Sequence, residues 1–266
     1  MMNDVAKKQL LLFFCVMLFV VGILPVFAPH EPFEIRLHDL LHSPSLKYFF
    51  GTDGLGRDVF SQILFGLRTS LIIGFLVVSI SVTIGLVVGG AAGYLGGLAD
   101  RVFLFVADVF QAFPGVLLAI AIAAFLQPSL LNLICLLSFV GWVSYARVVR
   151  AQVSEMKSRE FIQAGLAMGF SRRRLLFKHF LPNIMGPLVV QASFGMAGAV
   201  MAESTLSFLG LGLPENIASL GKIIDNGVGL LIVAPHVAFF PGLAIMAIVL
   251  TFNFLGDSLR ARVVGV

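Results

Sequence analysis

Charged residues are scarce in this chain. Asp, Glu, Lys and Arg make up 12% of its 266 residues, about half the ~25% that is typical of soluble domains. Hydrophobic residues reach 59%, and the mean hydropathy is +1.01. This composition excludes a soluble globular domain of useful size and predicts an all-α integral membrane protein. The net charge of +4 is then explained by basic loops that fix orientation, rather than by a nucleic-acid partner.

Cysteine is nearly absent, which limits the chemistry that the chain can carry. Cys15 and Cys135 both lie within apolar runs, so we interpret them as packing residues and expect neither a disulfide framework nor a cysteine metal site.

Catalytic motifs are also missing. The sequence has no GxxxxGK[ST] phosphate loop and no GxSxG nucleophile turn. The HEPFE stretch beginning at His30 lacks the second histidine of a zinc-protease helix. His38 and His42 could share a helix face, but two ligands fall short of a usual metal site, so solvated loop histidines are the favoured interpretation. We therefore expect no enzyme, no metal and no bound cofactor.

Long apolar runs predict six membrane-spanning helices. Each is about long enough to cross a ~30 Å hydrocarbon core. The expected spans are Leu10–Phe27, 70–93, 102–125, 130–149, 187–212 and 236–256. The first run has 18 residues and is followed by Ala28-Pro29, a poor cleavage site, so a spanning helix is favoured over a signal peptide.

Loop charge predicts the orientation. Segment 147–187 holds eight Lys and Arg residues against two Glu, whereas segments 29–69 and 213–235 each carry one more acidic than basic residue. The positive-inside rule then places segment 147–187 and both termini in the cytoplasm. A short apolar patch, Val228–Ala234, is too short to span and could form an external or re-entrant helix.

These expectations divide the chain into four parts. They are an N-terminal transmembrane helix (1–28), an external segment (29–69), a five-helix core (70–258) with a cytoplasmic loop (151–186), and a cytoplasmic tail (259–266).

The stretch Arg159–Asn183 is the longest polar interruption after the first quarter of the chain. It predicts two short helices separated by a break at Gly169-Phe170-Ser171. We expect Ser171 to cap the second helix and Pro182 to end it. The first helix carries small residues that would let another protein approach closely, and the second is basic. The small residues are Ala164, Gly165, Ala167 and Gly169, and the basic residues are Arg172, Arg173, Arg174 and Lys178.

Other residues within the apolar runs carry local predictions. Gly85, Gly89 and Gly93 recur every four residues and predict close packing against another helix. Asp108 and Glu203 are costly in lipid. Each could belong to a substrate path or pair with a neighbouring helix. Pairing is the favoured interpretation for Asp108, whereas the two interpretations are equally supported for Glu203. Pro114 and Pro241 are expected to kink or weaken their spans, which fits either a moving gate or a static bend.

Several long motifs resemble those of a known family. Arg159–Asn183 is similar to the EAA loop of binding-protein-dependent ABC importer permeases, with its central glycine at Gly169 and its Leu-Pro at Leu181-Pro182. Four further stretches resemble motifs of the dipeptide, oligopeptide and nickel permease group. They are GTDGLGRDVFSQILFGLRTSL (51–71), DVFQAFPGVLLAIA (108–121), AESTLSFLGLG (202–212) and FPGLAIMAIVLTFNFLGDSLR (240–260).

The resemblance implies a type I ABC importer permease in a bacterial inner membrane. It would pair with a second, similar permease, with two ATPase subunits that use ATP and Mg, and with an external solute-binding protein. Peptides would be the substrate, with nickel or a metal chelate as the alternative. The resemblance implies that ATPase contact falls on Glu160, Gln163, Ala164, Gly165, Ala167, Gly169, Phe170 and Ser171.

Two departures from the family pattern stand out. Glu-Ala-Ala is replaced by Gln163-Ala164-Gly165, and Pro-Ser-Trp-Gly by Ala218-Ser219-Leu220-Gly221.

The alternative functions are a stand-alone secondary transporter or channel, an intramembrane enzyme, and a basic loop that only contacts anionic lipid. Paired ionisable residues or inverted repeats would favour the transporter, and the sequence shows neither.

Overall fold

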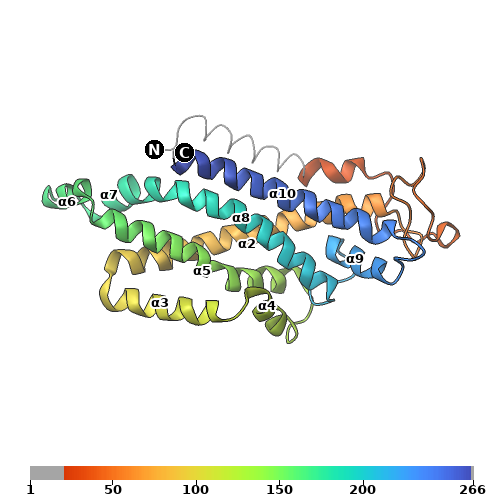
Figure 1. Ribbon diagram of the computed structural model, residues 1–266, viewed down its shortest axis with the longest axis horizontal. Coiled ribbons are helices and arrows are strands. Elements are labelled where there is room, and N and C mark those ends of the chain that lie inside the picture. Colours follow the sequence, from red (N-terminus) through yellow and green to blue (C-terminus); the bar gives the residue numbers. More distant parts are fainter. Residues whose placement is uncertain (1–20, 265–266) are drawn as a thin grey trace.

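The computed structural model describes residues 21–264, and apart from one isolated bridge between Thr52 and Asp58 its regular structure is helical. The helices form an elongated bundle (Figure 1). Short helices α6 (Glu160–Ala167) and α7 (Arg172–Leu175) stand at one end, and α9 (Leu220–Val228) stands at the other, beside the loops before residue 59. Most of the predicted span Leu10–Phe27 lies outside the described residues, and its end, Leu24–Phe27, is a 3-10 turn.

Four helices in the described part of the chain are long and apolar enough to cross a membrane. They comprise α2 (Val59–Leu95), α5 (Leu130–Lys157), α8 (Leu181–Phe208, with the preceding turn) and α10 (His236–Val264). A bent pair, α3 (Gly97–Ala112) and α4 (Gly115–Ala123), gives a fifth if it is counted as one span.

Helix α2 begins earlier than predicted. The Asp58 carboxylate accepts a hydrogen bond from the Ser61 amide and caps the helix at Val59. The helix therefore includes residues 59–69, which we predicted to lie in the segment before the span, and the irregular part of that segment ends at residue 58. Hydropathy does not reveal a carboxylate cap in a polar loop. The start of the helix, when predicted from the apolar run alone, therefore falls too late in the sequence.

The predicted span 102–125 is sharply bent at Pro114, where the sequence predicted a kink or a weak point. Its two parts, α3 and α4, meet at an angle of 78° across Phe113 and Pro114. Phe113 is extended, as is usual before proline, and Pro114 has no amide hydrogen to continue the ladder. Pro241, by contrast, lies inside α10, which continues through it.

Pro182 does not end a helix, contrary to the prediction. The π-helical turn Leu176–Phe180 follows α7 directly, and Pro182 falls in the first turn of α8, where a missing amide hydrogen costs little. The Asn183 side chain donates to the His179 carbonyl. The basic segment thus runs without a break into a spanning helix, which starts well before the predicted residue 187.

The last two elements differ from prediction as well. The apolar patch Val228–Ala234, which could have formed a short helix, is mainly turn. The short helix at the end of the bundle opposite α6 and α7 is α9, Leu220–Val228. Helix α10 extends to Val264, so the predicted tail 259–266 is helical as far as it is described.

Close approach of α2 and α5 forms the centre of the bundle. Cβ atoms placed at Gly85 and Gly93 would lie 2.6 Å from Tyr145 Cβ and 2.7 Å from the Arg150 carbonyl oxygen. A Cβ at Gly89 would overlap the carbonyl group of Ala146. The three glycines therefore face α5 and allow its backbone to lie directly against α2.

Candidate functional site

A glycine turn shapes the end of the molecule formed by α6 and α7. The Phe170 amide donates to the Gly165 carbonyl at 2.9 Å, and the Gly169 amide donates to the Leu166 carbonyl at 3.0 Å. These are the two bonds of a Schellman motif, with Gly169 at the left-handed position, φ 76°. The Ser171 hydroxyl then accepts from the Arg174 amide at 3.3 Å, which starts the next helix. We call residues 159–175 the knob.

The inward face of α6 attaches the knob to the bundle. Ile162 is 1% exposed, and Gly165 is also buried. A Cβ at Gly165 would lie 3.0 Å from the Phe170 ring and 3.3 Å from Leu175. Gly165 therefore belongs to the inner packing of the knob, not to its outer surface as the sequence pattern suggested.

The outward face of α6 is exposed and combines small with apolar residues. Ala164, Ala167 and Gly169 are exposed, and a Cβ at Gly169 would meet no atom within 4 Å. Large apolar side chains flank them: Phe161, Leu166 and Met168. Glu160, Gln163 and Ser171 are also exposed. Such a surface, apolar and with few bulky side chains at its centre, suits close contact with another protein.

Several contacts join the knob to the long helices. Leu175 and Phe180 are each 1% exposed within the main core cluster. The Phe180 ring packs edge-on against Tyr94 of α2 with centroids 6.0 Å apart, and the Lys157 ammonium donates to the Tyr94 carbonyl at 2.8 Å. Ile162 and Leu175 of the knob thus share one core cluster with residues of α2, α5 and α8, and the residues that flank the knob contact α2. A displacement of the knob is therefore passed to these helices.

The second helix of the knob is held by an aromatic stack. The Arg174 guanidinium lies 4.0 Å from the centre of the Phe170 ring, and the His179 ring stacks on Phe170. Phe170, one of the predicted contact residues, is half-buried in this stack. It thus supports the turn more than it faces outward.

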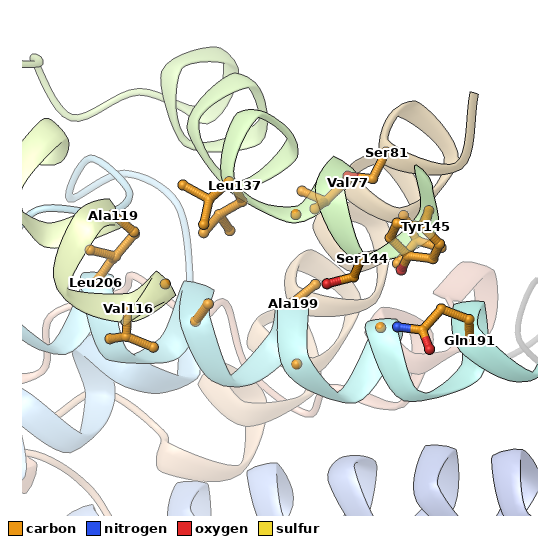
Figure 2. A pocket seen from close by; sticks show the side chains of 17 residues that line it. Val77, Ser81, Val116, Ala119, Leu137, Ser144, Tyr145, Gln191, Ala199 and Leu206 are labelled. Atoms are coloured by element: carbon orange, nitrogen blue, oxygen red, sulfur yellow. The ribbon is translucent and has the colours of Figure 1, made fainter. Parts of the chain in front are cut away.

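A cavity of about 240 Å³ lies between α2, α4, α5 and α8 (Figure 2). Val116, Ala119 and Leu206 form one side of it, and Ser144, Tyr145 and Gln191 gather at the other. Sequence reasoning did not identify this site. The available signal was weak: single polar side chains inside apolar runs, on helices far apart in the chain.

Glu203 is fully buried and does not line this cavity. Four serine hydroxyls donate to its carboxylate, from α2, from α8 itself and from the start of α9. The donors are Ser70 at 2.7 Å, Ser219 at 2.8 Å, Ser207 at 3.0 Å and Ser204 at 3.3 Å. The carboxylate therefore ties the beginning of α9 to two long helices.

The sequence Ala218-Ser219-Leu220-Gly221, which departs from the family pattern, lies at the start of α9 and includes Ser219, one of the donors to Glu203. Leu220 is fully buried, and a Cβ at Gly66 of α2 would lie 3.0 Å from it. A Cβ at Gly221 would overlap the Ser204 carbonyl. Leucine thus fills the position where the resembled family has tryptophan.

Asp108 pairs with Arg147 of α5, and its side chain is 69% exposed. A second ion pair joins the same two helices, with Asp100 accepting from Arg150 Nε at 2.6 Å. Both acidic groups of α3 therefore meet arginines of α5, and Asp108 does not line the cavity.

Polar side chains organise the loop before α2. Asp53 is 2% exposed and accepts from the backbone amides of Leu55 and Arg57, from the Arg57 guanidinium and from the Gln62 side-chain amide. These bonds fold the GTDGLGRD sequence into a compact turn against the start of α2.

Asp39 anchors the other part of this loop. The Tyr48 hydroxyl donates to its carboxylate at 2.6 Å and the Lys47 ammonium at 3.1 Å, which lowers the pKa of Asp39 below its ordinary value. His42 lies 3.6 Å from Asp39. No group of three potential metal ligands occurs within the described residues, so His38 and His42 form no site of that size there.

Comparison with known proteins now identifies the family. Residues 81–264 match the family model described as "Binding-protein-dependent transport system inner membrane component". A dipeptide transport system permease protein of Alkalihalophilus pseudofirmus is 39% identical over 227 residues, covering 85% of this chain and 75% of that protein. An oligopeptide transport system permease protein of Bacillus subtilis is 34% identical over 258 residues, covering 97% and 84%.

A solved structure has the same fold. An inward-facing methionine ABC transporter superposes with a TM-score of 0.59 at 20% identity, covering 76% of this chain and 96% of that chain. The resemblance stated from the sequence motifs is therefore confirmed. The chain belongs to the inner membrane components of binding-protein-dependent transport systems, the permease subunits of ABC importers, which leave ATP hydrolysis to partner ATPases.

Proposed function

We propose that this chain forms half of a peptide translocation path and that its knob is the contact for a cytoplasmic ATPase. The observation that carries the proposal is the exposed face of Ala164, Ala167 and Gly169 at the tip of a turn packed against three long helices. An ATPase that closes on this face would move the knob and the spans together. Glu160, Gln163 and Ser171 would supply the polar contacts around it.

Loop charge and helix direction support the proposed orientation. The knob carries the basic excess of the chain and belongs on the cytoplasmic side. Helix α10 ends toward the same end of the bundle (Figure 1), which supports a cytoplasmic C-terminus as well. A sixth span before residue 28, added to the four long helices and the α3–α4 pair, would place the N-terminus there as well. The membrane would be the bacterial inner membrane.

The opposite end would receive an external solute-binding protein. It consists of the loops before α2, the start of α9 and the turn after α9, where Ile232 and Val233 are strongly exposed. A second permease would pack against the open side of the cavity. ATP and Mg would be bound by two partner ATPase subunits and not by this chain.

Peptides are the proposed substrate. The relatives reported above are named for dipeptides and oligopeptides, and another with 38% identity is named for glutathione. No relative named here is a nickel transporter, so the nickel alternative receives no support.

Reconstitution tests this function. The chain, a second permease from the same cell, two ATPases and the solute-binding protein are placed in liposomes, and uptake of a radiolabelled dipeptide and of Ni²⁺ is measured. We expect dipeptide to accumulate with ATP but not with a non-hydrolysable analogue, and not when this chain is omitted. Uptake that needs no ATPase, or accumulation of Ni²⁺ without dipeptide, would contradict the proposal.

A further inference from the structure

The hydroxyl of Tyr145 is the most unusual polar group of the cavity. Tyr145 is 4% exposed, lies about midway along α5 and lines the cavity. Its hydroxyl makes no hydrogen bond to any residue that the structure describes. The hydroxyl oxygen is not one of the fully buried polar atoms without a partner in the described part of the chain, so it is open to the cavity and available to a ligand.

Two glycines hold the Tyr145 side chain in place. Gly85 of α2 faces its Cβ, and a Cβ at Gly195 of α8 would overlap its hydroxyl oxygen. The ring is thus enclosed between α2 and α8, and the hydroxyl occupies space that any larger residue at 195 would fill. This site is built around a fixed hydroxyl group and is not a loosely packed gap.

Two neighbouring side chains offer further unused hydrogen-bonding groups. Ser144 and Gln191 line the same side of the cavity as Tyr145 (Figure 2). Neither side chain bonds to another described residue. Together, two hydroxyls and a carboxamide provide both donors and acceptors.

The lining contains no charged side chain and no histidine, cysteine or carboxylate. It therefore offers no counter-charge to a metal cation or to the charged terminus of a peptide. A neutral amide, with one acceptor and one donor, matches these groups. The volume of about 240 Å³ is below the ~300–1,000 Å³ of ordinary small-molecule pockets, so it fits part of a ligand.

We propose that the cavity between α2, α4, α5 and α8 is a transit site in which Tyr145 donates a hydrogen bond to a peptide-bond carbonyl of the substrate, assisted by Ser144 and Gln191. Val116, Ala119 and Leu206 would contact the adjacent uncharged side chain. This inference rests on the proposed function and adds the chemical group that is recognised within the membrane.

Tyr145→Phe tests the proposal because it removes only the hydroxyl. In the reconstituted complex, we expect ATP-dependent dipeptide uptake to fall about fivefold, the effect of losing one hydrogen bond. Peptide affinity of the external binding protein and the amount of assembled complex should stay unchanged. Tyr94→Phe, the same change on α2 away from this cavity, is the matched control and should transport like the unmodified complex.

A labelling experiment covers the case in which Tyr145→Phe does not assemble. Ser144→Cys, in a background with Cys15→Ser and Cys135→Ser, should react with a bromoacetyl dipeptide during ATP turnover and be protected by excess dipeptide. Uptake by Tyr145→Phe within twofold of the control would overturn the inference, as would the absence of labelling at Ser144→Cys. If the unmodified complex takes up no peptide at all, the proposed function itself fails, which is a distinguishable result.

Discussion

At the scale of single residues, Glu203 shows how a costly group is accommodated. A carboxylate inside an apolar run indicated either a substrate path or a structural pairing. The structure surrounds it with four serine hydroxyls and places it outside the cavity. Because these bonds join α2, α8 and the start of α9, we expect its main contribution to be the attachment of α9.

Substituting Glu203 tests that role. Glu203→Ala should lower the unfolding free energy by about 2 kcal/mol, because four buried hydroxyls lose their acceptor. Glu203→Gln, which keeps one carbonyl oxygen, should cost less. Thermal unfolding in detergent measures both, with Glu215→Ala as the control, since the Glu215 side chain is 93% exposed. Equal melting temperatures for Glu203→Ala and the control would argue against the structural role.

Residue-scale prediction from sequence succeeded in locating unusual residues but not their surroundings. Glu203 is conspicuous in its apolar run. Its donors Ser70 and Ser219 are far apart in the chain and are ordinary residues by type. Tyr145 and Gln191 were missed for the same reason, since only the fold brings them to one cavity.

At the scale of helices, small residues decide how closely α2 and α5 approach. Gly89 and its neighbour Gly90 make a direct comparison. A Cβ at Gly89 would overlap the Ala146 carbonyl, whereas the nearest atom to a Cβ at Gly90 is Val149 Cγ1 at 3.9 Å. Alanine at position 89 would therefore clash with the α5 backbone, whereas alanine at position 90 would make an ordinary van der Waals contact.

This difference predicts opposite effects on stability. Gly89→Ala should destabilise the protein by about 1–3 kcal/mol, because the two helices must separate. Gly90→Ala should be neutral or stabilising by up to about 1 kcal/mol, through the better helix propensity of alanine. Melting temperatures of the two purified variants provide the measurement. If Gly89→Ala melted no lower than Gly90→Ala, the close packing would not be limiting.

Helix-scale prediction identified the long spans but not their ends. Apolar runs carry the signal for α2, α5, α8 and α10, whereas caps and proline effects depend on local geometry. Pro114 breaks a helix because Phe113 before it is extended, while Pro182 is tolerated in the first turn of α8 after a π-helical turn. The two prolines look alike in sequence, and their opposite effects explain the misplaced boundaries.

At the scale of the whole molecule, the knob and the spans form one connected core. Ile162, Leu175 and Phe180 are each 1% exposed in the same cluster as residues of α2, α5 and α8. Loop charge and the glycine break located the knob from sequence alone. The Schellman turn explains why a glycine is required at position 169, where φ is positive. The sequence could not show which face of α6 points outward, because the helix is too short for a clear pattern. Gly165, one of the predicted contact residues, is buried inside the knob.

The most direct test of the central claim is to purify the complex with a bulky residue on the outward face of the knob. Ala164→Arg adds a long side chain at an exposed position without disturbing the core. Ser43→Arg, exposed in the loops at the opposite end, is the matched control. We predict that Ala164→Arg remains in the membrane but loses most of the co-purifying ATPase, while Ser43→Arg retains it. Full retention of the ATPase by Ala164→Arg would contradict the account.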